Sequence, residues 1–429
     1  MRGALASGRT WRWPSLAFIF VTVFVDMVGY GLVIPLLPFY AREYAAGAAL
    51  VGLLGSLYAA MQFVGGPFLG SLSDRTGRRP VLVVCLLGAS FAYLLLGLAE
   101  TPSLLFAAVV LAGAAGGTQA TAQAYIADST SPEDRVRGLG LIGAAFGLGL
   151  MAGPTLGGLL SLYSLHAPAF AASALALANA AFGFFVLPES LPPKLRTPTP
   201  LRRLNPLSQL RRVLGLRNIR WFLLAVFLLN VSFAGLLTNF PLFSNARFGW
   251  SAPVNAFFFA FVGVCTVLTQ GWLIGRLQPR LGEERLLLGG LSVMALGLGF
   301  VAVVPYGLLL YPVVGALAVG IGLAIPALTA LISRRVSGRE QGRIMGGLQA
   351  VISVTLIVGP VMAGLAFERL GVPAPYWIGA LLAALAFLAA LVALLPEHRS
   401  LPVERSLAKQ TSPESDVHQG SRGKEAQPG

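Results

Sequence analysis

The chain has 429 residues, of which 56% are hydrophobic and only 11% are charged. A soluble domain carries about 25% charged residues, so this composition excludes a cytosolic enzyme and a disordered or fibrous protein. The 31 Lys and Arg residues outnumber the 17 Asp and Glu residues. They gather in short clusters between long apolar runs, which favours a role in membrane orientation over nucleic-acid binding.

Apolar runs follow one another along nearly the whole chain. About 20 apolar residues are needed for a helix to cross the hydrocarbon core of a bilayer. Twelve segments reach that length: 14–39, 48–72, 80–99, 103–127, 138–162, 168–187, 219–243, 253–275, 286–304, 307–332, 344–367 and 374–395. We therefore expect an all-α membrane protein with twelve transmembrane helices. The first run is much longer than the apolar region of a signal peptide, so we expect it to be retained.

Basic residues lie almost entirely in alternate links between these segments. If the N-terminus is cytoplasmic, the inner segments hold 28 Lys and Arg residues, whereas the outer links hold only Arg42, Arg247 and Arg369. The positive-inside rule then predicts that both termini are cytoplasmic. The high content of Ala, Gly, Leu and Arg is typical of a GC-rich prokaryote, so we expect a multi-pass protein of the cell (inner) membrane.

Landmarks in the first half of the chain return in the second at an offset of 205 to 208 residues: Gly70–Gly77 as 275–282, Gly153-Pro154 as Gly359-Pro360, and Pro188-Glu189 as Pro396-Glu397. A near-constant offset indicates two parallel halves. The predicted units are a cytoplasmic N-terminus (1–13), an N-terminal six-helix bundle (14–187), a basic cytoplasmic linker (188–218), a C-terminal six-helix bundle (219–395) and a disordered cytoplasmic tail (396–429).

The linker is rich in proline and in basic residues. Asn205-Pro206 could cap a short amphipathic helix whose apolar side chains face lipid, namely those of Leu207, Leu210, Val213 and Leu214. A disordered tether is the alternative reading.

A short charged loop joins the second and third segments, with the pattern Gly70-x-Leu72-x-Asp74-Arg75-x-Gly77-Arg78-Arg79. Gly77 can take a positive φ in a tight turn, and Asp74 can accept backbone N–H bonds at a helix start. The arginines would stay at the inner membrane surface. The alternative is that they serve only to anchor the topology.

The fifth segment carries Gly149-x-x-x-Gly153-Pro154-x-x-Gly157-Gly158. Small residues at four-residue spacing allow two helices to approach closely, and Pro154 removes a backbone bond and bends the helix. Ordinary packing of small residues is the alternative.

The first segment carries Asp26-x-x-Gly29-x-Gly31-Leu32-x-x-Pro35-x-Leu37-Pro38. With these three motifs, roughly residues 15–396 resemble the major facilitator superfamily. More narrowly, they resemble its twelve-helix drug/proton antiporters, the group of the tetracycline exporters. The resemblance implies two pseudo-symmetric six-helix bundles, a monomer, and an antiporter role for the glycine motif of the fifth segment. It also implies that Asp74 and Arg78 join Asp128, at the inner end of the fourth helix, in a charge cluster that locks one conformation.

Asp26 is the only ionisable residue well inside a predicted span. A charged carboxylate in mid-membrane costs about 2.5–3.5 kcal/mol on insertion scales, so burial disfavours the ionised form. A carboxyl that gains and loses its charge with water access can carry a proton. Its counterpart in the second half is Ser232, so the fold does not require an acid there. A structural carboxyl bonded to a neighbour such as Tyr30 is the alternative.

One position departs from the resemblance. Many family members carry a buried arginine in the fourth helix, nineteen residues before the acid that ends it. Counting back from Asp128 gives Val109. If that arginine normally couples proton and substrate, coupling in this chain must differ or be absent.

The resemblance implies that helices 1, 4, 7 and 10 border a central cavity, where the candidate substrate contacts are Tyr30, Gln119, Gln123, Tyr125, Asn230, Asn239 and Thr329. The absence of a buried Lys or Arg argues against phosphate esters and organic dianions, which need a fixed positive clamp. The leading hypothesis is export of amphipathic or lipophilic, drug-like or tetracycline-like molecules in exchange for protons by alternating access. A proton gradient would drive it without a cofactor. A sugar or metabolite facilitator or symporter of the same fold is the alternative.

A membrane enzyme or receptor is disfavoured. His166, His398 and His418 lie in links or in the tail, Cys85 and Cys265 lie in apolar runs, and the sequence has no nucleophile triad, metal-ligand cluster or phosphate loop. We therefore expect no enzymatic activity, no metal and no nucleic acid. The expected partners are a small-molecule substrate, protons and the lipid bilayer.

Overall fold

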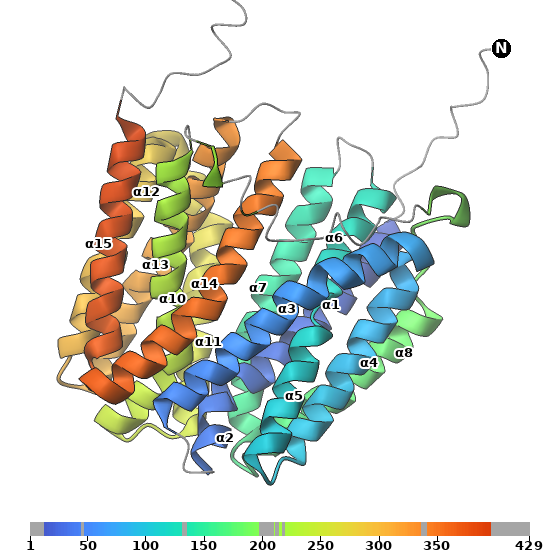
Figure 1. The fold of residues 1–429 in the computed structure, drawn as a ribbon, viewed down its shortest axis with the longest axis horizontal. Helices are drawn as coiled ribbons and strands as arrows, with labels where there is room; N and C mark the ends of the chain where they lie inside the picture. The colour runs from blue at the N-terminus through green and yellow to red at the C-terminus, as the bar shows by residue number, and fades with distance from the viewer. Residues whose placement is uncertain are drawn as a thin grey trace, which may run out of the picture.

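The computed structural model describes residues 13–43, 47–130, 135–196, 210, 214–216, 219–335 and 341–395, and this part of the chain is almost entirely helical, with no strand (Figure 1). The long helices of the N-terminal half are α1 (Trp13–Val33), α3 (Ala48–Thr76), α4 (Arg78–Gly97), α5 (Pro102–Ala114), α6 (Thr118–Ser129), α7 (Arg135–Leu160) and α8 (Ala167–Phe185). Those of the C-terminal half are α10 (Arg220–Phe248), α11 (Ala252–Leu268), α12 (Ile274–Val303), α13 (Leu310–Arg334), α14 (Gln341–Leu370) and α15 (Ala374–Leu394). The short helix α2 (Leu37–Glu43) continues the line of α1.

Ten helical segments of the described part are long and apolar enough to cross a membrane, or eleven when the two limbs of α10, bent by 44°, count as one. One of them, Ala252–Val303, has 52 residues. A helix of that length would rise about 78 Å, far more than the hydrocarbon core of about 30 Å. Gly282, with a φ of 73°, interrupts it inside α12, so α11 and the first turns of α12 form one crossing and the part of α12 after Gly282 forms the next. The described chain therefore has the expected twelve crossings.

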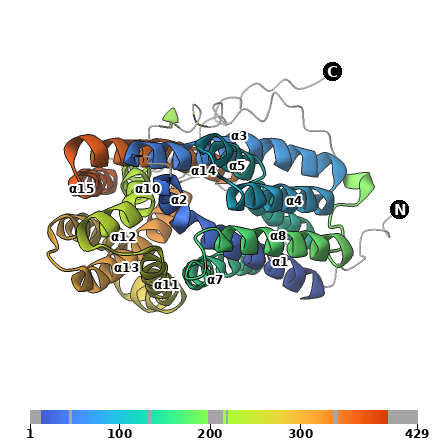
Figure 2. The same ribbon diagram turned by 90° about the horizontal axis from the view of Figure 1, so that it is seen from below.

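The helices form two bundles joined along two helix pairs. In the N-terminal half α1 packs on α7 and α4 packs on α8, while in the C-terminal half α10 packs on α15 and α12 packs on α13. The halves meet mainly through α3 with α14 and through α7 with α11, and Figure 2 shows the two groups side by side. The predicted fold class, an all-α membrane protein of two six-helix bundles, is confirmed.

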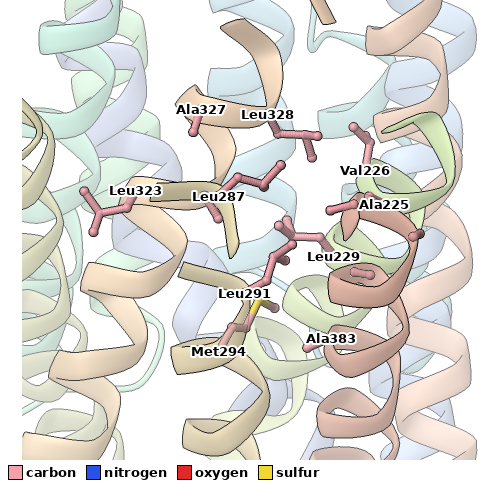
Figure 3. Packing of buried hydrophobic residues seen from close by; sticks show 14 of the residues in the cluster. Ala225, Val226, Leu229, Leu287, Leu291, Met294, Leu323, Ala327, Leu328 and Ala383 are labelled. Atoms are coloured by element: carbon pink, nitrogen blue, oxygen red, sulfur yellow. The ribbon is translucent and has the colours of Figure 1, made fainter. Parts of the chain in front are cut away.

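Each half has its own apolar core. In the C-terminal half, Leu287, Leu291 and Met294 of α12 pack between α10 and α13 (Figure 3). Separate clusters fill the N-terminal half, including one around Leu36, Tyr40 and Leu54. Since most members of each apolar cluster belong to one half, each half can move as a unit.

The fourth crossing is not the continuous helix that the sequence predicts over 103–127. It consists of α5 and α6, separated by a turn over Ala115–Gly117. Gly113, Gly116 and Gly117 weaken the helix here because glycine is a poor helix former. The break lies near the middle of the crossing and exposes the N-terminal end of α6 inside the bundle.

Most of the predicted linker helix, which begins at Asn205-Pro206, lies outside the described part of the chain, as do residues 1–12, 197–204, 217–218 and the tail 396–429. Of its proposed apolar face, Leu210 packs against the C-terminal core, whereas Leu214 is 58% exposed. Leu207 and Val213 lie outside the described residues.

Candidate functional site

Asp26 lies near the middle of the first crossing and is half-buried. Its carboxylate is hydrogen-bonded to the hydroxyl of Thr118, the first residue of α6. Tyr58 of α3 and Tyr93 of α4 lie within electrostatic range of the same carboxylate. The ion pairs of the described residues do not include Asp26. Its favourable contacts are therefore a hydroxyl and the end of a helix.

That helix end has an electrostatic consequence. The first N–H groups of an α-helix lack intrahelical acceptors, and the helix dipole places about half a positive charge there. Because the side chain of Thr118, the first residue of α6, contacts Asp26, this positive end lies near the carboxylate. Broken helices whose N-termini face a charged group are a recurring device in membrane transporters. The fourth crossing, which has Val109 instead of an arginine, therefore still provides a partial positive charge, that of the N-terminal end of α6.

A cavity of about 130 Å³ lies in the N-terminal half, between α1, α3, α4 and α5. Tyr30, Tyr58, Tyr93 and Gln62 supply its polar groups, and the rest of its wall is apolar. The rings of Tyr30 and Tyr58 are 5.9 Å apart. Ala234 of α10 and Leu356 and Pro360 of α14 close it from the other half. A relative motion of the two halves would therefore change its shape.

Val109 is part of the wall of this cavity and is almost fully buried. Many family members have a buried arginine at the position of Val109. This chain has an apolar side chain there instead. Such a wall suits an apolar or aromatic ligand and gives nothing that would hold an anion.

The structure separates the predicted cavity residues into three groups. Tyr30 lines the cavity, and it faces Tyr58 rather than bonding to Asp26. Gln119 and Gln123 are exposed on α6. The other four are engaged or enclosed elsewhere, and none of them lines this cavity.

Those four residues bond locally or sit in tight packing. The Tyr125 hydroxyl donates to the carbonyl of Pro188 at 2.9 Å. Asn230 and Thr329 each donate to a carbonyl one turn back in their own helix. Asn239 is fully buried, and neither atom of its amide has a hydrogen-bond partner in the described part of the chain.

Tyr58 and Tyr93 are site residues that the sequence did not single out, because they lie outside helices 1, 4, 7 and 10. The feature of the sequence that could have identified them is a tyrosine within a long apolar run. A phenolic hydroxyl within a long apolar run needs either a partner or a wet cavity.

The conformational motif forms a compact charge cluster between α3, α4 and α6. The guanidinium of Arg78 donates to Asp74 at 2.5 Å, to Asp128 at 2.8 Å and to the hydroxyl of Ser73 at 2.7 Å. All of these residues belong to the N-terminal half. Any influence of this cluster on conformation must therefore act through the shape of that half.

The start of α4 is capped by Glu189 rather than by Asp74. Glu189 accepts the backbone N–H groups of Arg78 at 2.8 Å and of Arg79 at 3.3 Å. Gly77 has a φ of 113°, and a Cβ there would collide with the Glu189 carboxylate. Asp74 instead lies in the last turn of α3, bonded to the Arg78 side chain. Of the remaining motif residues, Arg75 is exposed, and a Cβ added at Gly70 would meet nothing within 4 Å.

The C-terminal half carries a counterpart with the charges exchanged. Glu283 follows Gly282, as Arg78 follows Gly77, and it pairs with Arg334 at 2.6 Å. Arg334 ends α13 at the position that corresponds to Asp128 in the repeat. The two halves thus share one ion-pair geometry with opposite polarity.

The glycine motif of α7 contacts two different helices, α1 and α11. A Cβ at Gly149, Gly153 or Gly157 would lie less than 3 Å from atoms of α1. A Cβ at Gly158 would instead collide with Ala256 of α11. The motif therefore sets both the packing of α7 inside its own half and its contact with the other half.

The halves touch at one end of the bundle. We call the end that carries Gly77, Glu189 and Gly282 the basic end; α2 lies at the opposite end (Figure 1). In the described part, two hydrogen bonds join the halves: Ser56 to the carbonyl of Ile357 at 2.5 Å, and the N–H of Ala49 to Glu368 at 2.9 Å. Both lie on α3 and α14 in their portions toward the opposite end.

Toward the basic end the same helices separate. A Cβ added at Gly66 of α3 or at Gly143 or Gly147 of α7 would meet nothing within 4 Å. Val64 and Phe68 of α3 are 64% and 54% exposed. These sides of α3 and α7 are therefore unpacked toward the basic end, whereas the hydrogen bonds between the halves lie toward the other end.

A model of the Major Facilitator Superfamily matches residues 19–336 and 272–423. The chain belongs to the major facilitator superfamily. This transporter is 39% identical to the tetracycline resistance protein, class C, of Escherichia coli, over 81% of this chain and 88% of that protein. It is 34% identical to the class B protein of Escherichia coli, over 84% and 89% of the two chains.

Among solved structures, this transporter resembles that of the human organic anion transporter MFSD10 (TETRAN), with a TM-score of 0.69 and 25% sequence identity over 88% of this chain and 99% of that one. The family, its relatives and the multi-pass helices agree on a membrane transporter of small molecules rather than an enzyme.

Proposed function

We propose that this transporter exports amphipathic or lipophilic small molecules, of which tetracycline-like compounds are the first to test, in exchange for protons. The observation that carries the proposal is the position of Asp26. Its carboxylate lies without an ion-pair partner among the described residues, beside the start of α6 and beside a cavity lined by tyrosines. The relatives named as tetracycline resistance proteins support the substrate class.

The arrangement of the two halves indicates the side of the membrane from which a substrate would enter. The positive-inside rule places the basic end and both termini in the cytoplasm. In this conformation a substrate would enter from the cytoplasm or the inner leaflet. Separation of α3 from α14 and of α7 from α11 would then expose the site on the other side.

Protonation of Asp26 would provide the coupling. In contact with water from outside, the carboxyl binds a proton, and the neutral form returns through the closed state at low electrostatic cost. In contact with the cytoplasm, the Thr118 hydroxyl and the start of α6 stabilise the ionised form, so the proton leaves. This chain would therefore obtain, from a helix end, the positive potential that an arginine at position 109 would supply.

The side chains that line the cavity limit the kinds of substrate that can bind there. Tyr30, Tyr58 and Tyr93 offer aromatic faces and hydroxyls, and Val109 offers an apolar surface. Neutral and singly cationic amphiphiles fit such a wall, since aromatic faces attract cations and apolar area favours lipophilic rings. Organic anions would find no Lys or Arg in the wall.

The test is transport in proteoliposomes loaded with tetracycline or a lipophilic cationic dye, with an imposed pH gradient. Asp26→Asn is expected to abolish gradient-driven transport while leaving folding intact, and Asp26→Glu to restore part of it. Glu100→Gln removes an exposed carboxylate from the link between α4 and α5 and serves as the matched control. Gradient-driven transport at the normal rate in Asp26→Asn would contradict the proton role. Absence of transport of both compounds in the wild type would contradict the substrate class.

A further inference from the structure

A groove on the side of the N-terminal half lies outside the proposed transport path. It has a volume of about 430 Å³ and is formed by the first turn of α4, the last turn of α8 and the short segment after α8. Its lining residues are Arg79, Pro80, Val83, Phe184, Glu189 and Arg196. It lies at the basic end, where the helices leave the membrane.

The groove carries two arginines and one carboxylate, that of Glu189. The guanidinium of Arg79 stacks on the ring of Phe184, with 5.5 Å between the guanidinium carbon and the ring centroid, and donates to the carbonyl of Phe184. Arg196 donates to the carbonyl of Leu191 at 3.4 Å. The ion pairs of the described residues include neither arginine.

The one acid in the groove is already occupied. The carboxylate of Glu189 accepts three backbone N–H groups, those of Arg78, Arg79 and Leu191. Its oxygens are therefore bonded to the start of α4 and to its own turn. An arriving anion would meet two guanidinium groups against one carboxylate, which leaves the groove with a net positive charge.

The other wall is apolar and faces lipid. Phe184 is 55% exposed and the adjacent Phe185 is 80% exposed, as expected for side chains in contact with acyl chains. Pro80 and Val83 continue this surface along α4 toward the membrane interior. The groove thus has two parts. Arg79 and Arg196 form a cationic rim at headgroup depth, and Pro80, Val83 and Phe184 form an apolar track in the hydrocarbon.

We propose that this groove binds one anionic phospholipid, with its phosphate between Arg79 and Arg196 and an acyl chain along Val83 and Phe184. Guanidinium groups form paired hydrogen bonds with phosphate oxygens, and basic pockets between helices at this depth suit anionic headgroups. A free phosphate ion would use only the rim, and a neutral detergent would use only the track. The lipid uses both.

Native mass spectrometry of the full chain, released from nanodiscs that contain equal amounts of phosphatidylglycerol and phosphatidylcholine, tests this directly. We expect one tightly retained phosphatidylglycerol per protein. The double variant Arg79→Gln/Arg196→Gln is expected to retain it roughly 30-fold less well, since two basic groups near an anionic surface are removed. Val83→Trp, which fills the track and keeps both arginines, is expected to lose it as well.

The matched control is Arg276→Gln. Arg276 also stacks on an exposed aromatic ring, with 4.1 Å to the centroid of Trp272, but it does not belong to this groove. This variant is expected to keep the lipid. Equal retention of the two lipids by the wild type, unchanged retention in the double variant, or release of the lipid by millimolar inorganic phosphate alone would overturn the proposal. Circular dichroism and gel filtration establish that each variant is folded.

Discussion

The backbone of Gly153 in α7 lies against the backbone of Gly31 in α1. A Cβ at Gly153 would be 2.6 Å from the Cα of Gly31, and one at Gly31 would be 3.0 Å from the Cα of Gly153. Each glycine belongs to a different sequence motif, one in the first crossing and one in the fifth. A single close approach therefore explains why both positions are glycine, and it fixes the helix that carries Asp26.

Gly153→Ala is expected to destabilise the protein by about 1–3 kcal/mol, since the new methyl group has rigid backbone on the facing side. Thermal unfolding of the purified protein in detergent measures the effect. Gly147→Ala lies on the same helix with nothing within 4 Å of its new methyl group and serves as the control. Equal melting temperatures for the two variants would contradict this account of the motif.

Thr118→Val is expected to change the pH dependence of transport. The hydroxyl of Thr118 is a polar partner of the Asp26 carboxylate, which is the group proposed to carry the proton, and valine removes that partner with little change in shape. Thr118→Ser keeps the hydroxyl and is expected to retain the wild-type profile. The rate of pH-gradient-driven transport is measured as a function of cytoplasmic-side pH. Identical profiles for Val and Ser at this position would show that the bond plays no part in coupling.

Glu368→Ala is expected to move the conformational equilibrium toward the state that is open at the opposite end. The side chain accepts the N–H of Ala49 across the halves, and in the described part this is one of two such hydrogen bonds. Spin labels at Leu98 and Tyr306, both exposed at that end, report the separation of the halves. The native Cys85 and Cys265 are first replaced by alanine.

Glu368→Gln keeps an acceptor oxygen and is expected to leave the distance between the labels closer to that of the wild type. If neither variant changes the distance distribution, this hydrogen bond does not hold the halves together.

Glu283→Arg is expected to lower the thermal stability of the protein, because it places a second positive charge beside Arg334. Adding Arg334→Glu reverses the pair and is expected to restore most of the loss. This exchange reproduces in the C-terminal half the polarity that the N-terminal half has naturally. A double variant as unstable as the single one would mean that factors other than charge fix the polarity of this pair.

Hydropathy predicted the crossings, and the repeated motifs predicted the two halves, because both depend on long-range composition and on turns that few residues can form. The break between α5 and α6 was not predicted. Its glycines lie within the apolar run 103–127, which is long enough to be predicted as one continuous transmembrane helix. Glu189 was recognised only as a repeat landmark, since a cap supplied from a distant segment leaves no local pattern.

The cavity was harder to predict than the fold. Tyr125, Asn230 and Thr329 are polar residues in suitable helices, yet their side chains bond to backbone carbonyls in the structure. In a membrane helix such a bond is as common a role for a polar side chain as ligand contact. Sequence position alone cannot distinguish the two roles, whereas burial and partners do.

Every ion pair of the described residues lies within one half, and the two hydrogen bonds between halves lie at the end away from the charged clusters. The halves can therefore rock past each other without pulling apart any of these oppositely charged groups. In the proposed exchange, the hydrogen bond from Ala49 to the Glu368 carboxylate is then the contact to a charged group that separation of the halves would break in the described part of the chain. Because the ion pairs of the described residues stay intact in such a motion, we expect the rate of transport to depend only weakly on ionic strength.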